Sequence, residues 1–455
     1  MNGFAVGFAR VNITPPLGTP LSGYYQVRLA NGILDELEAN AVAFSLGDTR
    51  AVLISMDITS LFQVYAEPLR REIAEAAGLE PEAVILHCTH THTGPEVNLS
   101  RRIAPPIQEE YFTFFRSRLR DAAVLALQDL KPARMGWAVG RAPDIAFIRR
   151  FRMKDGSIRT NPGVNNPEID GPIGRVDDRV GVVRFDREGG PAIILAGIGI
   201  HPDTVGGCAV SADWPGFFRR TLEKAVDHTR CVFLNGAEGD VNHVNVSPAP
   251  GQLNDLAMDF DDVMRGYGHA RHMGWTVAGA VLQVLSKVRY EPVDSLRVMK
   301  RVIRHPSSMP SADELPLARR YNELHQAGRD SEIPYEGMML TTVVAEAERM
   351  LELEHGPEAF DLNLSALAVG RVALVGIPGE PFTDVGRALK AAPGWSLVLP
   401  CCLTNGNEGY FPTMDAYREG GYEARSSIFR PGVAEAIVRA GLDMLAELRP
   451  AEDRA

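Results

Sequence analysis

The chain has 455 residues, with 47 basic and 58 acidic side chains and therefore a net charge of −11. Hydrophobic residues make up 45% and charged residues 23% of it, a globular balance that excludes disordered, collagen-like and coiled-coil chains. An acidic chain without a marked cluster of Lys and Arg is a poor candidate for binding nucleic acid or anionic lipid. We therefore expect a small-molecule substrate as its partner, and a homo-oligomer is compatible with the sequence.

The cysteines and the apolar segments indicate where the protein works. Five cysteines, of which Cys401 and Cys402 are adjacent, do not make a disulfide framework, so reduced thiols are expected. Residues 1–10 lack the basic and apolar regions of a secretory signal. The apolar stretch Ala192–Ile200 is too short to span a bilayer. These features predict a cytoplasmic protein without an integral membrane segment.

Short apolar runs, which predict strands, alternate with amphipathic segments, which predict helices, along most of the chain. After an alternating strand at Phe4–Val11, the predicted strands are Ala41–Ser45, Ala51–Ser55, Ala83–His87, Val180–Phe185, Ala192–Ile200, Cys231–Leu234, Ser295–Ile303, Ala366–Gly370, Val372–Ile377 and Ser396–Leu399. The predicted helices are Leu61–Ala77, Gln108–Leu130, Phe217–Val226, Val263–Val288, Leu340–Glu354 and Val433–Leu448. This interleaving favours a single large layered α/β domain over residues 1–455, with a mixed β-sheet flanked by helices. The charged, helical pattern of residues 304–356 predicts a helical insertion within it.

The most unusual segment follows the strand Ala83–His87 and reads Cys88-Thr89-His90-Thr91-His92-Thr93-Gly94-Pro95. If the chain stays extended, His90 and His92 project to the same face, because strand side chains alternate. Two imidazoles on one face at a strand end suit a transition metal, or one metal ligand and one proton-transfer group. Hydrogen-bonded loop histidines are the alternative, and the clustering favours the metal.

Two further strands end in side chains that could complete a metal site. His201 follows Ala192–Ile200, and Glu380 follows Val372–Ile377. Ligands in open α/β sheets bind at the carboxyl ends of the strands. Two histidines and a carboxylate form a common catalytic zinc set with an open position for water. The alternative for Glu380 is the first turn of a following helix, where an acid favours the helix dipole.

These motifs carry a resemblance to a known family. They are Thr89–Pro95, His201-Pro202, Gly239-Asp240-Val241, Pro378-Gly379-Glu380, and Gly409-Tyr410 with the later Tyr417 and Tyr422. In this order the chain resembles the catalytic domain of the neutral/alkaline non-lysosomal ceramidases, as a short member of bacterial type. The resemblance implies zinc ligands at His90, His201 and Glu380 and a fourth at Tyr410, for which a tyrosine packed in a turn is the alternative.

The same resemblance implies roles for His92 and Arg149, and two further residues are candidates apart from it. His92 is expected to transfer protons, and Arg149, with Arg150 beside it, to contact an anion, an oxyanion or the substrate. Tyr422 is a second candidate for acid catalysis. His243 is expected to contact the substrate or to lie just behind the metal ligands.

The sequence also departs from the family. Asn242-His243-Val244 stands where the ceramidases have Ser-Pro-Asn, and neither a C-terminal β-domain nor a secretory signal is expected. We therefore predict a zinc-dependent hydrolase that cleaves an amide (N-acyl) bond with metal-activated water, on a substrate smaller and more soluble than ceramide. One alternative is a zinc-dependent lyase acting by β-elimination on an acidic sugar. Another is a non-catalytic metal- or ligand-binding relative.

Overall fold

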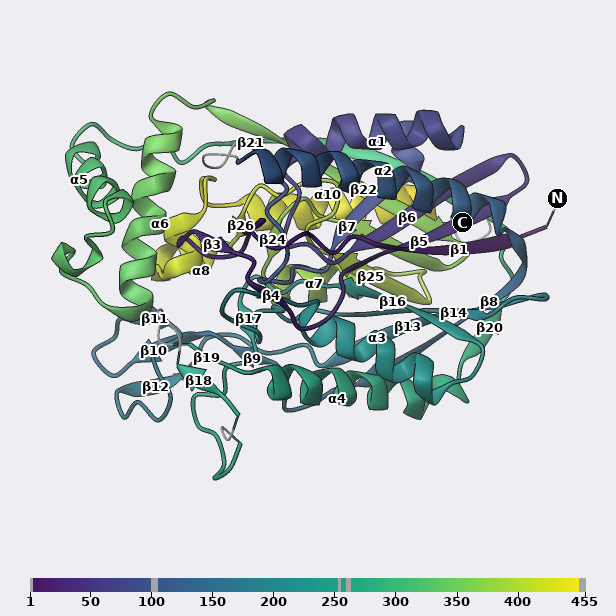
Figure 1. Cartoon of the computed structure of the whole chain (residues 1–455), viewed down its shortest axis with the longest axis horizontal. Coiled ribbons are helices and arrows are strands. Elements are labelled where there is room, and N and C mark those ends of the chain that lie inside the picture. The colour runs from purple at the N-terminus through teal and green to yellow at the C-terminus, as the bar shows by residue number, and fades with distance from the viewer. Residues whose placement is uncertain (1–2, 100–104, 253–254, 259–262, 450–455) are drawn as a thin grey trace.

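The computed structural model describes residues 3–99, 105–252, 255–258 and 263–449. Within these ranges, a nine-stranded sheet packs face to face on a four-stranded sheet, and helices cover the outer faces of both (Figure 1). The predicted α/β class, with a mixed sheet flanked by helices, is therefore confirmed.

The large sheet has the strand order β16-β14-β13-β8-β1-β5-β6-β7, and β20 pairs with β8. Its strands are β1 Ala5–Asn12, β5 Glu38–Leu46, β6 Thr49–Met56, β7 Val84–Cys88, β8 Lys131–Arg141, β13 Arg179–Arg187, β14 Ala192–Ile198, β16 Thr229–Asn235 and β20 Arg289–Glu291. The small sheet consists of β21 Leu296–Pro306, β22 Ala359–Val369, β23 Val372–Gly376 and β25 Leu397–Cys401. The pairs β6–β7, β14–β16 and β23–β25 are parallel, and the other neighbours are antiparallel.

Two helices cover each half of the large sheet, and two more cover the small sheet. Helices α1 (Gln63–Ala77) and α2 (Pro106–Gln128) pack on β1, β5, β6 and β7, on the side of the molecule opposite α3 (Asp213–Ala225) and α4 (Tyr267–Leu285) (Figure 1). Helices α7 (Thr383–Lys390) and α10 (Val433–Leu448) pack on the outer face of the small sheet. The remaining helices are α5 Leu315–Gln326, α6 Gly337–Leu353, α8 Met414–Glu419 and α9 Tyr422–Ser426.

Residue size matches the two faces of β5. Ala41 and Ala43 face the helices, whereas the larger Val42 and Phe44 face the small sheet. The small side chains let α2 approach closely. A Cβ on Gly7 of the neighbouring β1 would lie 1.9 Å from the carbonyl oxygen of Ala126 in α2. Strand β5 is therefore buried on both faces, which is why its sequence is apolar without alternation.

Some predicted boundaries differ from the structure. Residues 304–306 continue β21, and α5 and α6 occupy the rest of the predicted insertion at one end of the molecule (Figure 1). Strand β22 begins at Ala359 rather than at residue 366. Strand β8 was not predicted, because only four of its eleven residues are buried and it contains Pro132 and two glycines. Local sequence patterns therefore detect fully buried strands better than partly exposed ones.

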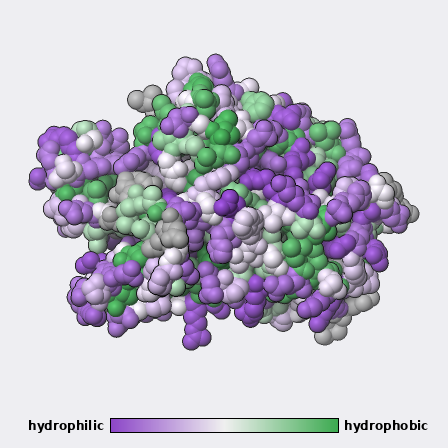
Figure 2. Space-filling model, turned by 60° about the horizontal axis from the view of Figure 1, so that its bottom comes forward, coloured by the Kyte–Doolittle hydropathy of each residue, from purple (hydrophilic) through white to green (hydrophobic). Residues whose placement is uncertain are grey.

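On the face shown in Figure 2, hydrophilic and hydrophobic residues are intermixed. Among the residues that the structure describes, no helix is both long and apolar enough to cross a membrane. All five cysteines are unpaired, as the sequence predicts.

Candidate metal centre

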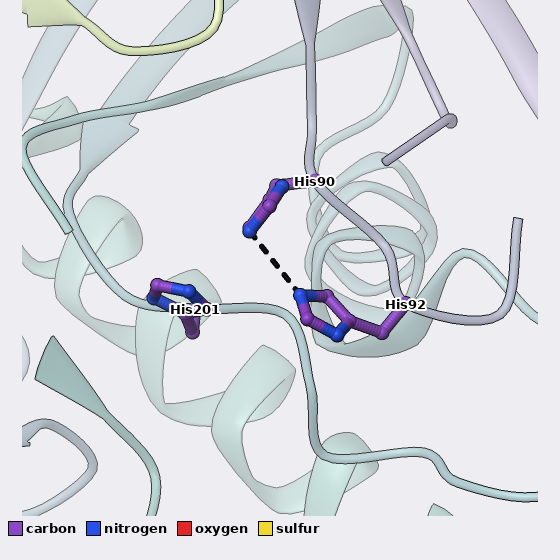
Figure 3. A group of neighbouring side chains, drawn as sticks. All are labelled: His90, His92 and His201. Atoms are coloured by element: carbon purple, nitrogen blue, oxygen red, sulfur yellow. Dashed lines mark hydrogen bonds between the residues drawn. The ribbon is translucent and has the colours of Figure 1, made fainter. Parts of the chain in front are cut away.

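His90 and His92 come together in a loop, not on a strand. Strand β7 ends at Cys88, and His90 has a φ of 76°, which is uncommon outside glycine. The prediction that an extended strand aligns the two rings is therefore wrong. The turn brings them together instead, with 3.2 Å between their Nε2 atoms (Figure 3). Such a strained conformation costs on the order of 1–3 kcal/mol and is found preferentially at functional sites.

The environments of His90 and His201 fix the tautomer of both rings. Nδ1 of His90 donates to the carbonyl oxygen of Thr59 (2.9 Å). Nδ1 of His201, just beyond β14, faces the carbonyl oxygens of Glu238 (3.0 Å) and Val241 (3.2 Å). Because carbonyls only accept, each Nδ1 carries a proton, and the neutral form of each ring has its lone pair on Nε2. The rings lie 4.8 Å apart, so both can present nitrogen ligands to one metal.

Glu380 lies between these two nitrogen atoms. It belongs to the short strand β24 (Glu380–Pro381), and α7 begins only at Thr383, so it does not lie in the first turn of a helix. Its Oε2 is 3.2 Å from Nε2 of His201 and 3.6 Å from Nε2 of His90. Burial opposes its ionisation, but the two histidines hold the pKa of Glu380 well below its usual range. A carboxylate therefore joins the two imidazoles.

Glu238 is a fourth member of the cluster that the sequence analysis missed. It is fully buried, and its Oε2 contacts Nδ1 of His201. Ligand atoms of His90, His201, Glu238 and Glu380 all lie within 4.8 Å of one another. Glu238 follows the buried strand β16, as Glu380 follows β23. The strand-end reasoning that found Glu380 could therefore have found it.

The cluster fits a metal cation. Oε2 of Glu380 is buried, and no hydrogen bond ends on it. Tetrahedral ligand atoms about 2.0–2.2 Å from zinc lie about 3.3–3.6 Å from one another, close to the separations seen here. Burial is the largest influence on the pKa of His201 and lowers it, but Glu238 and Glu380 together outweigh burial and raise the pKa to about 10. The pocket therefore favours a positive charge. A metal cation would bind all three converging atoms, Nε2 of His90, Nε2 of His201 and Oε2 of Glu380, whereas a proton can be shared by only two of them.

The two predicted tyrosines lie next to the cluster. Tyr410 in β26 (Tyr410–Phe411) is the register partner of Glu380, and its ring stacks at 6.5 Å from that of His201. Tyr422 meets Tyr410 edge to face at 5.5 Å. Burial raises the pKa of Tyr410, and the charge of Arg149 acts against this. The structure thus brings both tyrosines beside the predicted ligands.

Arg149 is held rigidly at the edge of the cluster. Its Nε donates to Glu423 (2.7 Å), and its Nη2 donates to the carbonyl oxygen of Gly239 (2.7 Å). Its Nη1 lies 3.4 Å from Nε2 of His201 and so faces the cluster. Arg150 does not face it, because its Nη2 donates to Glu419 (3.1 Å) and to a backbone carbonyl. Of these two arginines, only Arg149 lies at the candidate site.

His92 has a carboxylate neighbour that the sequence analysis also missed. Oδ1 of Asp203 lies 3.4 Å from Nδ1 of His92. Arg265 donates to both oxygens of Asp203 (3.0 and 2.9 Å), and the Tyr24 hydroxyl also donates to it (2.5 Å). Burial opposes ionisation of Asp203, but Arg265 keeps its pKa well below the usual range. His92 therefore has a negative charge behind it, although its Nδ1 makes no hydrogen bond to any described residue.

His243 lies outside the cluster. Its Nε2 donates to the carbonyl oxygen of Met264 (2.6 Å). It lines a cavity of about 300 Å³ together with apolar residues such as Phe147, Val164 and Leu256. No predicted metal ligand lines this cavity, so the structure does not place His243 beside the metal ligands.

Comparisons with known proteins support the fold. Neither a family model nor a curated protein matches the sequence. Solved structures do match, among them neutral ceramidase from Pseudomonas aeruginosa and a ceramidase complexed with C2. Each has a TM-score of 0.72 and 18% identity, over 99% of this chain and 76% of the ceramidase chain. The chain has the neutral ceramidase fold. The resemblance drawn from the sequence motifs is thus confirmed at the level of the fold.

Proposed function

We propose that the protein is a zinc-dependent hydrolase that cleaves an amide (N-acyl) bond. The observation that carries this proposal is the convergence of His90 Nε2, His201 Nε2 and Glu380 Oε2 in one buried space. Two histidines with one carboxylate form a donor set typical of catalytic zinc. The fold shared with neutral ceramidase supports amide bonds as the target.

His90, His201 and Glu380 would hold the zinc, and Tyr410 would be the fourth ligand. When bound, the ion would polarise the substrate carbonyl and lower the pKa of a water molecule from about 15.7 towards about 7. Tyr410 starts as a neutral phenol, because burial raises its pKa. A neighbouring dication would favour the phenolate.

His92 would move the proton. Nδ1 of His92 makes no hydrogen bond within the described part of the chain, but the negative charge of Asp203 lies 3.4 Å from it and favours the tautomer that carries its proton on Nδ1. Nε2 then faces the cluster, where it can accept a proton from water and deliver it to the leaving amine. Burial holds the pKa of His92 well below its usual value, so the ring is neutral and ready to accept at neutral pH.

Arg149 would stabilise the negative charge that develops on the carbonyl oxygen. Glu423 and the Gly239 carbonyl fix its guanidinium, so Nη1 needs no reorganisation to donate into the site. A fixed donor of this kind typically contributes about 10²–10³ in rate. Tyr422 lies beside it, with the Arg149 guanidinium 5.8 Å from its ring centre, and is the second candidate for donating a proton.

The substrate would be an N-acyl compound smaller and more soluble than ceramide. Asn242 supports this, since it stands at the position of the ceramidase serine but turns its side chain to the protein. Its Nδ2 donates to Asn161 (3.0 Å), and its Oδ1 accepts from the Val244 backbone (3.0 Å). The side chain thus organises its loop. Arg150 and His243 lie outside the cluster, so any contact that they make with the substrate would be with a part of it that is remote from the amide bond.

The test combines metal analysis with a substrate screen. The purified protein is analysed for bound metal, stripped with a chelator and reloaded with zinc. It is then assayed for amine release from N-acyl compounds of increasing chain length, with ceramide included. We expect close to one zinc per chain, amine release that depends on zinc, and ¹⁸O from solvent in the carboxylate product. His201→Ala is the matched control. Absence of bound zinc, or an unsaturated product without ¹⁸O, would overturn the proposal.

A further inference from the structure

Glu238 is a buried carboxylate without a charged partner of the usual kind. Its exposed fraction is 0%, and neither carboxylate oxygen has a hydrogen bond of good geometry. Among the described residues, no Lys or Arg forms an ion pair with it, and the ion pair that reaches it comes from His201. A buried carboxylate is unfavourable unless an opposite charge compensates it. The cost of keeping Glu238 therefore points to a role at His201.

We propose that Glu238 is a positioning residue, whose carboxylate lies against Nδ1 of His201 and makes this ring the more strongly donating of the two histidine ligands. The proposal rests on the metal site proposed above. A carboxylate behind a ligand histidine fixes the ring and increases the basicity of the nitrogen that faces the metal. His90 differs, because only the Thr59 carbonyl stands behind it. The two histidines are therefore unequal ligands.

The geometry also argues that Glu238 acts through His201 and is not itself a ligand. Nε2 of His201 faces Glu380, whereas Nδ1 faces Glu238. A cation bound by both His201 and Glu380 would therefore be bound through Nε2 of His201, the ring nitrogen that faces away from Glu238. Tyr410 is the backbone register partner of Glu380, and its ring stacks at 6.5 Å from that of His201. This leaves Tyr410, not Glu238, as the fourth ligand.

Glu238→Gln tests the proposal, because it keeps the shape and an acceptor oxygen but removes the charge. Zinc affinity is measured by competition with a chelator, and the ligand set is read from the visible spectrum of the cobalt-substituted protein. We expect zinc affinity to fall about 10- to 100-fold while the cobalt band pattern is kept. Glu419→Gln is the matched control, because it removes a carboxylate that contacts Arg150 instead of a ligand histidine. It should bind zinc as the unaltered protein does.

Each outcome decides the question. Unchanged zinc affinity in Glu238→Gln would overturn the positioning role. A cobalt spectrum altered as in His90→Ala would show that Glu238 is a ligand and would also overturn it. If Glu238→Gln does not fold, Glu238→Asp is measured instead, because it keeps the charge on a shorter side chain. Its zinc affinity should fall, but by less than the roughly 10- to 100-fold expected for Glu238→Gln. Unchanged zinc affinity would again contradict the role. If the unaltered protein binds no zinc, the proposed function itself fails. Measuring the unaltered protein therefore distinguishes failure of the proposed function from failure of the positioning role of Glu238.

Discussion

Glu380 and Tyr410 are register partners in the parallel pair of β24 and β26, although they lie far apart in the sequence. The backbone N–H of Glu380 donates to the carbonyl oxygen of Gly409 at 2.9 Å, which fixes the two chains side by side. A predicted carboxylate ligand and a predicted phenolate ligand therefore sit on one small rigid unit. Their relative position does not depend on a flexible loop, as a preorganised metal site requires.

Tyr410→Phe should weaken zinc binding without unfolding the protein. The substitution removes one oxygen ligand and keeps the ring that packs by His201 and Tyr422. In the unaltered protein, zinc should generate the ultraviolet absorption of tyrosinate, because a dication favours the ionised phenol. The difference spectrum during zinc titration measures this, and Tyr422→Phe is the control that should retain the signal. A tyrosinate signal that persists in Tyr410→Phe would contradict the assignment.

His92→Ala should keep zinc but lose about 10²–10⁴ in kcat, the range of a general acid–base group. KM should change little, because proton transfer matters in the transition state. Asp203→Asn should cause a smaller loss, since it leaves the ring in place but removes the negative charge that favours Nδ1 protonation. Metal content and steady-state kinetics check both variants. If His92→Ala loses zinc in step with activity, His92 is a ligand.

Strand-end reasoning finds the parts of the site that are local in sequence. His90, His201 and Glu380 each follow an apolar strand, and the structure brings all three together. The convergence of His90 and His92 was predicted for the wrong reason, because the left-handed φ of His90 is set by the loop and not by strand alternation. Glu238 was within reach of the same reasoning.

Other parts of the site could not be read from the sequence. The pair of Arg149 and Glu423 joins residues 274 positions apart, and no local pattern marks either partner. The contact between Asp203 and His92 likewise depends on how two strand ends meet in space. Tertiary packing decides such pairings, so local patterns carry little information about them.

Gly239→Ala should impair zinc binding without altering a ligand. A Cβ at this position would lie 2.5 Å from the carbonyl oxygen of Glu380, so the backbone of that residue must shift. Metal sites tolerate displacements of only about 0.5 Å. Zinc affinity by chelator competition is the measurement. The matched control is Gly279→Ala in α4, where a Cβ meets nothing within 4 Å and zinc binding should be unchanged. Equal affinity in both variants would contradict the close packing behind Glu380.

Glu423→Gln should lower the free energy of unfolding by about 3–5 kcal/mol, because it leaves the buried charge of Arg149 without its partner. Denaturant titration measures this. Asp415→Asn removes one partner of an exposed ion pair with Arg418 and should cause no measurable change. Activity should fall as well, since Arg149 loses the contact that aims Nη1 at the site. A stable and fully active Glu423→Gln protein would remove the basis for a fixed oxyanion donor.

Zinc affinity should rise with pH, by about tenfold per unit between about pH 7 and about pH 9. The pKa of His201 in the metal-free protein is raised to about 10, so over this range zinc must displace a proton from the ring. By the same linkage, the metal-free protein gains stability from His201 below about pH 6.5 and loses it as the pH rises towards 10. Zinc affinity in metal buffers, together with proton release on zinc addition, checks the first expectation.

Burial alone would lower the pKa of His201, and Glu238 is the main group that raises it. In Glu238→Gln, zinc affinity should therefore rise less steeply with pH. A zinc affinity that is independent of pH in the unaltered protein would mean that His201 is already neutral before the metal binds.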